Sequence, residues 1–154
     1  MTATLSKSLA SQGGVVLGDN KIRAHLIDAA RTFIFDTGLA PAAVGAARAA
    51  LAVLQREPTR ALDVLARASE LADVTGAPSP ESAVVSVVLG DPQRAFDAAS
   101  ACRDQGGLHV GCFRPPSVPE GTSRLRLTAR ATLSASEMEQ IALVLREVLA
   151  GARA

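Results

Sequence analysis

The segment Ala83-Val84-Val85-Ser86-Val87-Val88-Leu89-Gly90-Asp91-Pro92 lies in the middle of this 154-residue chain and decides its fold. Its first seven residues form a short, uncharged, Val-rich run that is typical of a buried β-strand. Gly90 ends the strand, and Asp91 followed by a proline indicates a helix N-cap with proline at the first helical position. The segment therefore predicts a strand near 83–89 that leads directly into a helix over 92–103.

Two more strands and a final helix are expected downstream of this segment. Residues 108–113 are largely apolar after a Gly-Gly pair, and residues 124–128 alternate as in a half-buried strand. The three prolines within 114–119 exclude regular structure between them, because proline fixes φ and lacks an N–H donor. Residues 134–137 have the pattern of a capping box, which predicts a helix over 136–150.

Upstream, two helices precede the Val-rich strand. Pro41 is suited to a first helical turn and begins an Ala-rich helix that extends to residue 55. A Glu-Pro pair breaks that helix, and Thr59 is placed to cap a second helix that ends near Val74. We therefore expect residues 55–154 to form a small α+β domain in which two or three helices cover one face of the sheet.

The first forty residues have a different character. Strand-like residues flank a loop rich in small residues, and Asp19-Asn20 caps a helix of about ten residues that ends near Arg31. Residues 32–35, Thr-Phe-Ile-Phe, predict a short strand. The first forty residues are therefore expected to be the tail of a larger α/β sheet. Apolar side chains within residues 1–40 would then be exposed and would drive self-association.

The composition excludes several classes of protein. A net charge of +1 gives no electrostatic basis for binding nucleic acid or an anionic membrane, and there is no Trp or Tyr to stack on bases. There is no basic-then-apolar leader and no apolar run of 18 residues, so we expect a cytoplasmic protein. The cysteines (Cys102, Cys112) and histidines (His25, His109) lack ligand spacing, which predicts no metal site.

Lys7 is the first residue that can carry chemistry. It lies between two serines, in a segment that Gly13 and Gly14 border. An amine in this setting forms a Schiff base with a carbonyl compound when burial or neighbouring groups lower its pKa. From spacing alone, a solvated lysine near a chain end is the favoured interpretation.

A functional role for Lys7 is favoured by the ordered string Thr4-Leu5-Ser6-Lys7-Ser8-Leu9-Ala10-Ser11-Gln12-Gly13. This string resembles, position by position, the lysine motif of class II pyridoxal-phosphate enzymes. The strings Arg31–Ala42, Cys112–Pro119 and Gly121–Thr128 follow in order. Together they resemble the C-terminal part of the α-oxoamine synthase family. The resemblance implies an α/β fold, the C-terminal part of a fold-type I pyridoxal-phosphate transferase, with 1–54 from the cofactor-binding domain.

The resemblance also implies roles for individual residues. Lys7 would hold pyridoxal 5′-phosphate covalently, and Thr4 would hydrogen-bond the cofactor phosphate. Thr37 would contact the cofactor phosphate of a neighbouring subunit. Ser117 would contact substrate, and Arg126 would bind the carboxylate of the amino acid substrate.

Each of these roles competes with a simpler interpretation. Thr37 is equally well explained as a strand-end threonine, and the preceding Asp36 places a negative charge where the family often has a small hydroxyl residue. Ser117 also suits a turn serine that bonds its own backbone. Arg126 shares its strand face with Arg124, so periodicity does not separate the two. Ala10 replaces the family's usual glycine where the loop needs a free φ.

Within the family, the Arg-Pro-Pro-Ser-Val-Pro and Arg-Leu-Arg-Leu-Thr strings favour the branch that condenses L-alanine with a pimeloyl thioester in biotin biosynthesis. The thioester would be carried by coenzyme A or by acyl carrier protein, and the enzyme would be a homodimer. The resemblance leaves out the family's first half, so we expect a truncated gene product, a misassigned start or an expressed fragment. The alternative is a non-catalytic remnant or a dimerisation module that keeps only the small-domain fold.

Overall fold

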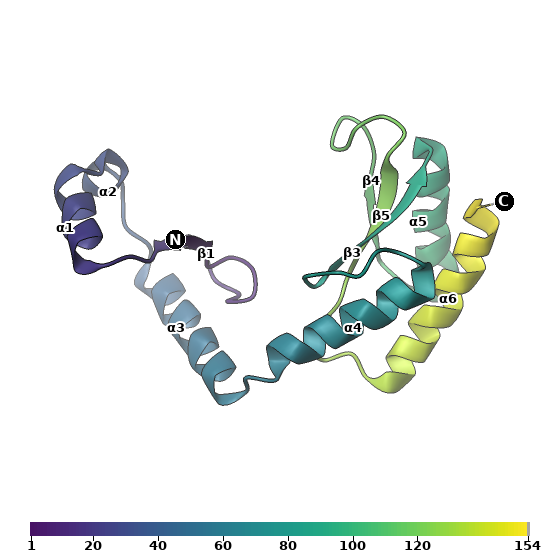
Figure 1. Ribbon diagram of the computed structural model, residues 1–154, viewed down its shortest axis with the longest axis horizontal. Helices are drawn as coiled ribbons and strands as arrows, with labels where there is room; N and C mark the ends of the chain where they lie inside the picture. Colours follow the sequence, from purple (N-terminus) through teal and green to yellow (C-terminus); the bar gives the residue numbers. More distant parts are fainter. Residues whose placement is uncertain (154) are drawn as a thin grey trace. The chain divides into compact units, whose positions relative to one another are not determined.

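The computed structural model describes residues 1–153 and divides the chain into two compact units, Met1–Pro58 and Thr59–Ala154. Figure 1 shows the elements of each unit in sequence order. The first unit contains a two-stranded antiparallel sheet and three helices. Its elements are β1 (Thr2–Thr4), β2 (Gly14–Val16), α1 (Asn20–Ala29), α2 (Arg31–Phe35) and α3 (Pro41–Arg56).

The helix predicted after Asp19 is confirmed as α1, and its start has the expected cap. The Asp19 side chain accepts a hydrogen bond from the backbone N–H of Ile22 at 2.9 Å. Pro41 occupies the first turn of α3, as its fixed φ favours. Both helix starts were therefore readable from local sequence.

The strand predicted at residues 32–35 is wrong, because this segment is the short helix α2. The backbone N–H groups of Phe33 and Ile34 both donate to the carbonyl of Ala30, at 2.9 and 3.0 Å. The guanidinium of Arg31 lies 5.6 Å from the ring centroid of Phe35, a pairing that i and i+4 side chains make on a helix. A short apolar run does not by itself distinguish strand from helix. The hydrogen bonds to Ala30 show that this run is helical.

The second unit contains three strands and three helices, as predicted. Its elements are α4 (Arg60–Thr75), β3 (Val84–Gly90), α5 (Pro92–Gly106), β4 (Gly111–Phe113), β5 (Ser123–Thr128) and α6 (Ala135–Arg153). Thr59 stands at the N-cap of α4, but its side chain makes no capping hydrogen bond, contrary to expectation. The strand expected over 108–113 is shorter, because the N–H of Leu108 still donates to Cys102 at the end of α5.

The sheet of the second unit is antiparallel throughout, with the order β3-β5-β4. Side chains on the central strand alternate: Leu125 and Leu127 are buried, whereas Arg126 and Thr128 are exposed. Helices α4, α5 and α6 pack on the face that carries Leu125 and Leu127, which confirms that the helices cover one side (Figure 1). The opposite face, called the open face below, carries Arg126, and no helix of the second unit covers it.

The two units differ in how much apolar surface they bury. The core cluster lies entirely within the second unit, around Leu125, Leu145, Val85 and Val87. In the first unit Ala47 alone among the described hydrophobic residues is buried. Within residues 1–153, no helix combines the length and the apolar character that crossing a membrane requires.

Candidate functional site

Lys7 lies in the loop that connects β1 to β2. The backbone N–H of Leu5 donates to the carbonyl of Gly13 at 2.9 Å, and that of Ser11 donates to Leu5 at 2.9 Å. A further turn is closed by the N–H of Ala10, which donates to the carbonyl of Lys7 at 2.9 Å. The loop is therefore tied at its base and around Lys7, while the lysine side chain is exposed.

Side-chain hydrogen bonds bring Lys7 and Thr4 together through Ser6. The Lys7 Nζ donates to the Ser6 Oγ at 3.0 Å, and the two hydroxyl oxygens of Ser6 and Thr4 are 2.8 Å apart. The Thr4 Oγ1 also accepts from the backbone N–H of Ser6 at 3.2 Å. The sequence motif indicates only a small residue at position 6. The position of Ser6 directly before the lysine is the one sequence feature that pointed to this contact.

Glycine and alanine set the shape of this loop. Gly13 has a φ of +91°, a backbone conformation that residues with a Cβ rarely adopt, and an added Cβ would also meet the side chain of Leu39. Ala10 has a φ of +48°, which confirms that the position needs the left-handed conformation in which glycine is favoured. The loop thus accepts one strained residue beside the lysine.

Thr37 lies directly after α2 in the first unit, and its side chain is exposed. Its backbone N–H donates to a carboxylate oxygen of Asp36 at 3.0 Å. Among the described residues, no hydrogen bond connects Thr37 to the loop that holds Lys7. The structure places a carboxylate beside Thr37, and that charge disfavours a phosphate at the same amide.

The two arginines of β5 have different surroundings, although both were candidates on sequence. The Arg124 Nε donates to the carbonyl of Thr122 at 2.9 Å, and its Nη1 is 3.5 Å from the Oγ of Ser86. Arg126 lies over the ring of Phe113, 4.8 Å from the centroid, and makes no hydrogen bond in the described part of the chain. Arg126 therefore retains all its N–H donors for a ligand, whereas Arg124 is committed to the protein.

Ser117 is exposed in the proline-rich loop between β4 and β5. Its backbone N–H donates to the carbonyl of Arg114 at 3.0 Å, which closes a turn and leaves the hydroxyl without a partner among the described residues. The Arg114 guanidinium lies over the ring of Phe96, 5.2 Å from its centroid. Thr4, Lys7 and Thr37 thus lie in the first unit, and Ser117 lies in the second.

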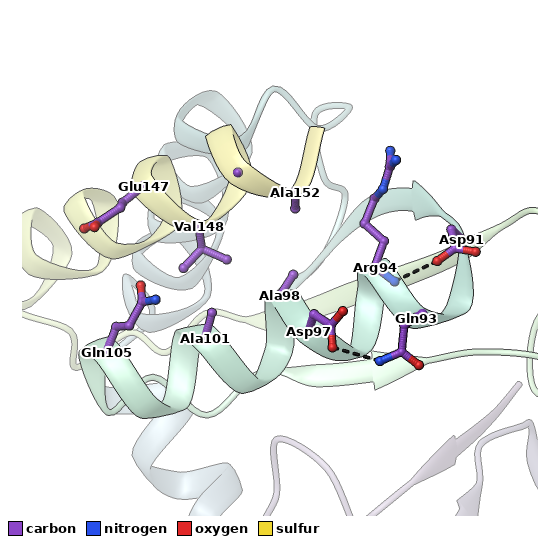
Figure 2. Close-up of a pocket in the computed structure, with 11 residues that line it drawn as sticks. Asp91, Gln93, Arg94, Asp97, Ala98, Ala101, Gln105, Glu147, Val148 and Ala152 are labelled. Carbon is purple, nitrogen blue, oxygen red and sulfur yellow. Dashed lines mark hydrogen bonds between the residues drawn. The ribbon is translucent and has the colours of Figure 1, made fainter. Parts of the chain in front are cut away.

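A groove on the second unit is lined by none of these residues. Figure 2 shows it between α5 and α6, with a floor of Ala98, Ala101 and Val148. Some of its polar side chains are bonded within α5: Asp91 accepts from the N–H of Arg94 at 2.8 Å, and Gln93 donates to Asp97 at 2.8 Å. The first contact caps α5, and the second is an i,i+4 pair within the same helix, so both stabilise α5.

The remaining reactive groups give no second site. Burial raises the pKa of the Cys102 thiol, which favours its neutral, unreactive form. Residues 1–153 contain no group of three or more His, Cys, Asp or Glu side chains placed to hold a metal ion.

Comparisons with known proteins agree with the motifs. A family model described as "Aminotransferase class I and II" matches residues 1–145. The 8-amino-7-oxononanoate synthase of Mycobacterium bovis is 68% identical over 154 residues, which covers 99% of this chain and 40% of that protein. The chain therefore spans about 40% of the length of the curated relatives it matches.

Solved structures give the same fold. A serine palmitoyltransferase holding pyridoxal phosphate as an internal aldimine matches with a TM-score of 0.85 at 26% identity, over 98% of this chain and 39% of that one. An 8-amino-7-oxononanoate synthase from Francisella tularensis matches with a TM-score of 0.77 at 21% identity, over 97% and 45% of the two chains. The predicted fold class, part of a fold-type I pyridoxal-phosphate enzyme, is confirmed.

Proposed function

The chain belongs to the aminotransferase class I and II family, and from this membership we propose that it is the part of an 8-amino-7-oxononanoate synthase that carries the cofactor lysine and the small domain. The observation that carries the proposal is the 68% identity to such synthases over essentially the whole chain. The enzymes of this family use pyridoxal 5′-phosphate. The proposed reaction is the decarboxylative condensation of L-alanine with a pimeloyl thioester of coenzyme A or acyl carrier protein.

The polar groups of the lysine loop are suited to pyridoxal phosphate, because the accessible amine of Lys7 lies next to the hydroxyl groups of Ser6 and Thr4. When bound, the cofactor supplies an electron sink for negative charge at the α-carbon of an amino acid. Lys7 would hold the cofactor through Nζ. After the amino acid displaces it, the same Nζ would take the proton from the α-carbon as a general base. The Thr4 hydroxyl would donate to a phosphate oxygen, and Ser6 would orient both groups.

Arg126 would bind the carboxylate of L-alanine, because its planar guanidinium donates two parallel hydrogen bonds to a carboxylate. The free hydroxyl of Ser117 would contact substrate. Thr37 would donate to the cofactor phosphate of a second subunit in a homodimer, although the neighbouring Asp36 carboxylate disfavours this role. We extend the proposal to a cytoplasmic location for this enzyme.

We propose two domains with different roles in this enzyme. Residues 1–54 would belong to the cofactor-binding domain, and residues 55–154 would form the small domain. The division of the structure into compact units after Pro58 supports a boundary near the end of α3.

A chimera tests this proposal. In it, the chain replaces the matching 40% of the M. bovis synthase, and turnover is measured as release of free thiol from pimeloyl-coenzyme A that depends on L-alanine. We expect the chimera to be active and Lys7→Ala to be inactive, because no other amine occupies the motif. Arg126→Ala should raise the KM for L-alanine by about thirtyfold or more, since losing one partner of a buried charge pair costs about 2–5 kcal/mol.

The matched control is Lys21→Ala, which removes the other lysine of the chain, in α1, and should leave turnover unchanged. Visible absorbance of the bound cofactor is a second readout, and Lys7→Ala should abolish it. An inactive chimera that folds and dimerises would contradict the proposal. Equal activity of the Lys7→Ala chimera and its parent would contradict the role of the lysine.

The second candidate is a non-catalytic module that keeps only the small-domain fold. The observation that favours it is the burial pattern, because the core cluster lies entirely in the second unit. A folded but inactive chimera would support this alternative.

A further inference from the structure

The open face of the sheet brings an aromatic ring and an arginine together across two strands. Gly111 and Phe113 alternate with Cys112 along β4 and so share one face. In the register of the sheet, Gly111 pairs with Arg126 and Phe113 pairs with Arg124. Phe113 and Arg126 are therefore diagonal neighbours, a separation that aromatic and long side chains bridge.

Gly111 provides the space into which the Phe113 ring extends. A Cβ added at Gly111 would lie 3.0 Å from the Cε2 of Phe113 and 3.5 Å from the Cβ of Arg126. The ring therefore folds back over Gly111 instead of projecting from the sheet. This places it beside Arg126, the residue directly opposite the glycine.

The contact between ring and guanidinium leaves the hydrogen-bond donors of Arg126 free. The Arg126 guanidinium carbon lies 4.8 Å from the centroid of the Phe113 ring. A guanidinium that lies on an aromatic ring uses its flat face, while its N–H donors point outward in its plane. Arg124, by contrast, already donates to Thr122 and reaches Ser86.

We propose that Phe113 is a positioning residue for Arg126, holding the guanidinium so that its in-plane donors face the carboxylate of the amino acid substrate. This inference rests on the proposed function, because it takes Arg126 to be the carboxylate ligand. Without the ring, a long exposed arginine samples many rotamers, and binding a carboxylate would have to order it. With the ring, that ordering precedes substrate binding.

The first test follows Arg126 itself in the 154-residue chain by NMR. The Nε–Hε resonance of Arg126, assigned with Arg126→Lys, should be shifted by the ring current of Phe113. Phe113→Leu should move it to the range of solvated arginines, and Phe113→Tyr should restore it. Phe96→Leu is the matched control, because it removes the ring under Arg114 and should leave the Arg126 signal in place.

The second test uses the chimera and separates KM from kcat. Phe113→Leu should raise the KM for L-alanine about two- to fivefold, the equivalent of one exposed cation–π contact, with little change in kcat. Phe113→Tyr should restore the KM, and Phe96→Leu should not change it. An unshifted Arg126 resonance in the parent chain, or an unchanged KM in an active Phe113→Leu chimera, would overturn the inference. If the proposed function itself is wrong, the parent chimera is inactive, and this result distinguishes that failure from failure of the inference on Phe113.

Discussion

At the scale of single residues, Ala10 shows how the lysine loop departs from an unstrained backbone. Its φ of +48° is in the left-handed region, where a Cβ costs roughly 1–2 kcal/mol. The N–H of Ala10 and the N–H of Ser11 both make loop hydrogen bonds, to Lys7 and to Leu5. The strained residue is therefore held in place by the same contacts that hold the lysine.

Replacing Ala10 with glycine should strengthen the loop. Glycine adopts the positive φ without strain, and after its greater loss of backbone entropy the net gain is up to about 1 kcal/mol. Hydrogen exchange of the Ser11 and Leu5 amides should then slow by up to about fivefold. Ala3→Gly, in the extended backbone of β1, is the control and should speed exchange. Faster exchange in Ala10→Gly would contradict the assignment of strain.

The lysine loop and the two arginines of β5 show which parts of the candidate site can be predicted from sequence. The resemblance of the Thr4–Gly13 string to a known lysine motif identified the loop, and the structure adds that Ser6 bonds to both Thr4 and Lys7. Alternation along the strand placed Arg124 and Arg126 on one face but did not separate them. The difference comes from tertiary neighbours, Ser86 and Phe113, which lie on other strands and so are not visible in local sequence.

At the scale of elements, the start of α6 is the capping box that its sequence predicts. The Ser134 Oγ accepts from the N–H of Glu137 at 3.2 Å, and a Glu137 carboxylate oxygen accepts from the N–H of Ser134 at 2.7 Å. The bond from the Ser134 N–H is the largest cause of a lowered pKa of Glu137. The Ser134 hydroxyl, which donates to the same carboxylate oxygen at 2.8 Å, and then the charge of Arg130 lower it further, whereas desolvation raises it. The capping box therefore stabilises the folded state at pH values at which Glu137 is ionised.

The pH dependence of this cap has a defined sign. The pKa of Glu137 is lower in the folded state, so its contribution is complete above the unfolded pKa and is lost as pH falls through the folded value. Ser134→Ala should raise the Glu137 pKa toward its ordinary value, measured by NMR titration of the carboxyl carbon. Ser134→Thr keeps the hydroxyl and should retain the lowered pKa. Alanine retains the backbone N–H at this position, so the rise should be partial, and an unchanged pKa in Ser134→Ala would show that the Ser134 hydroxyl does not contribute.

Most elements followed from local signals, and the exceptions have physical reasons. The Val-rich run predicted β3, and the Asp-Pro pair predicted the start of α5. The strand predicted over 32–35 is helical, because strand propensity has no effect without a neighbouring strand to pair with. Residues 108–110 fall outside β4, since Leu108 completes the end of α5.

At the scale of the whole molecule, exposed apolar side chains are concentrated in the first unit. Phe33 is 63% exposed and Phe35 is 76% exposed, and the apolar side chains of Val16, Leu17 and Ile34 are also exposed. Exposed apolar side chains, where they are contiguous on a protein surface, mark an interface or promote aggregation. The expectation of self-association from the sequence therefore stays a prediction with a structural basis.

Polar substitution of this surface should weaken self-association. The double variant Phe33→Ser/Phe35→Ser removes two large apolar groups, each worth about 1.5–3 kcal/mol when buried, so association should weaken at least about tenfold. Light scattering at high micromolar concentration gives the measurement. Leu143→Ser, at a residue 66% exposed on α6, is the control and should associate like the parent. A monomeric parent chain would contradict the prediction.

The position of β3 at the edge of its sheet has a consequence for the handling of this protein. β3 pairs only with β5 in the described chain, so the backbone groups along its other side have no strand partner. Its residues Val84–Leu89 carry no charge and no proline, the composition of segments that stack into cross-β fibrils. When the second unit unfolds locally, this segment can act as a template for fibril growth. Concentrated or heated samples should therefore form fibrils through β3.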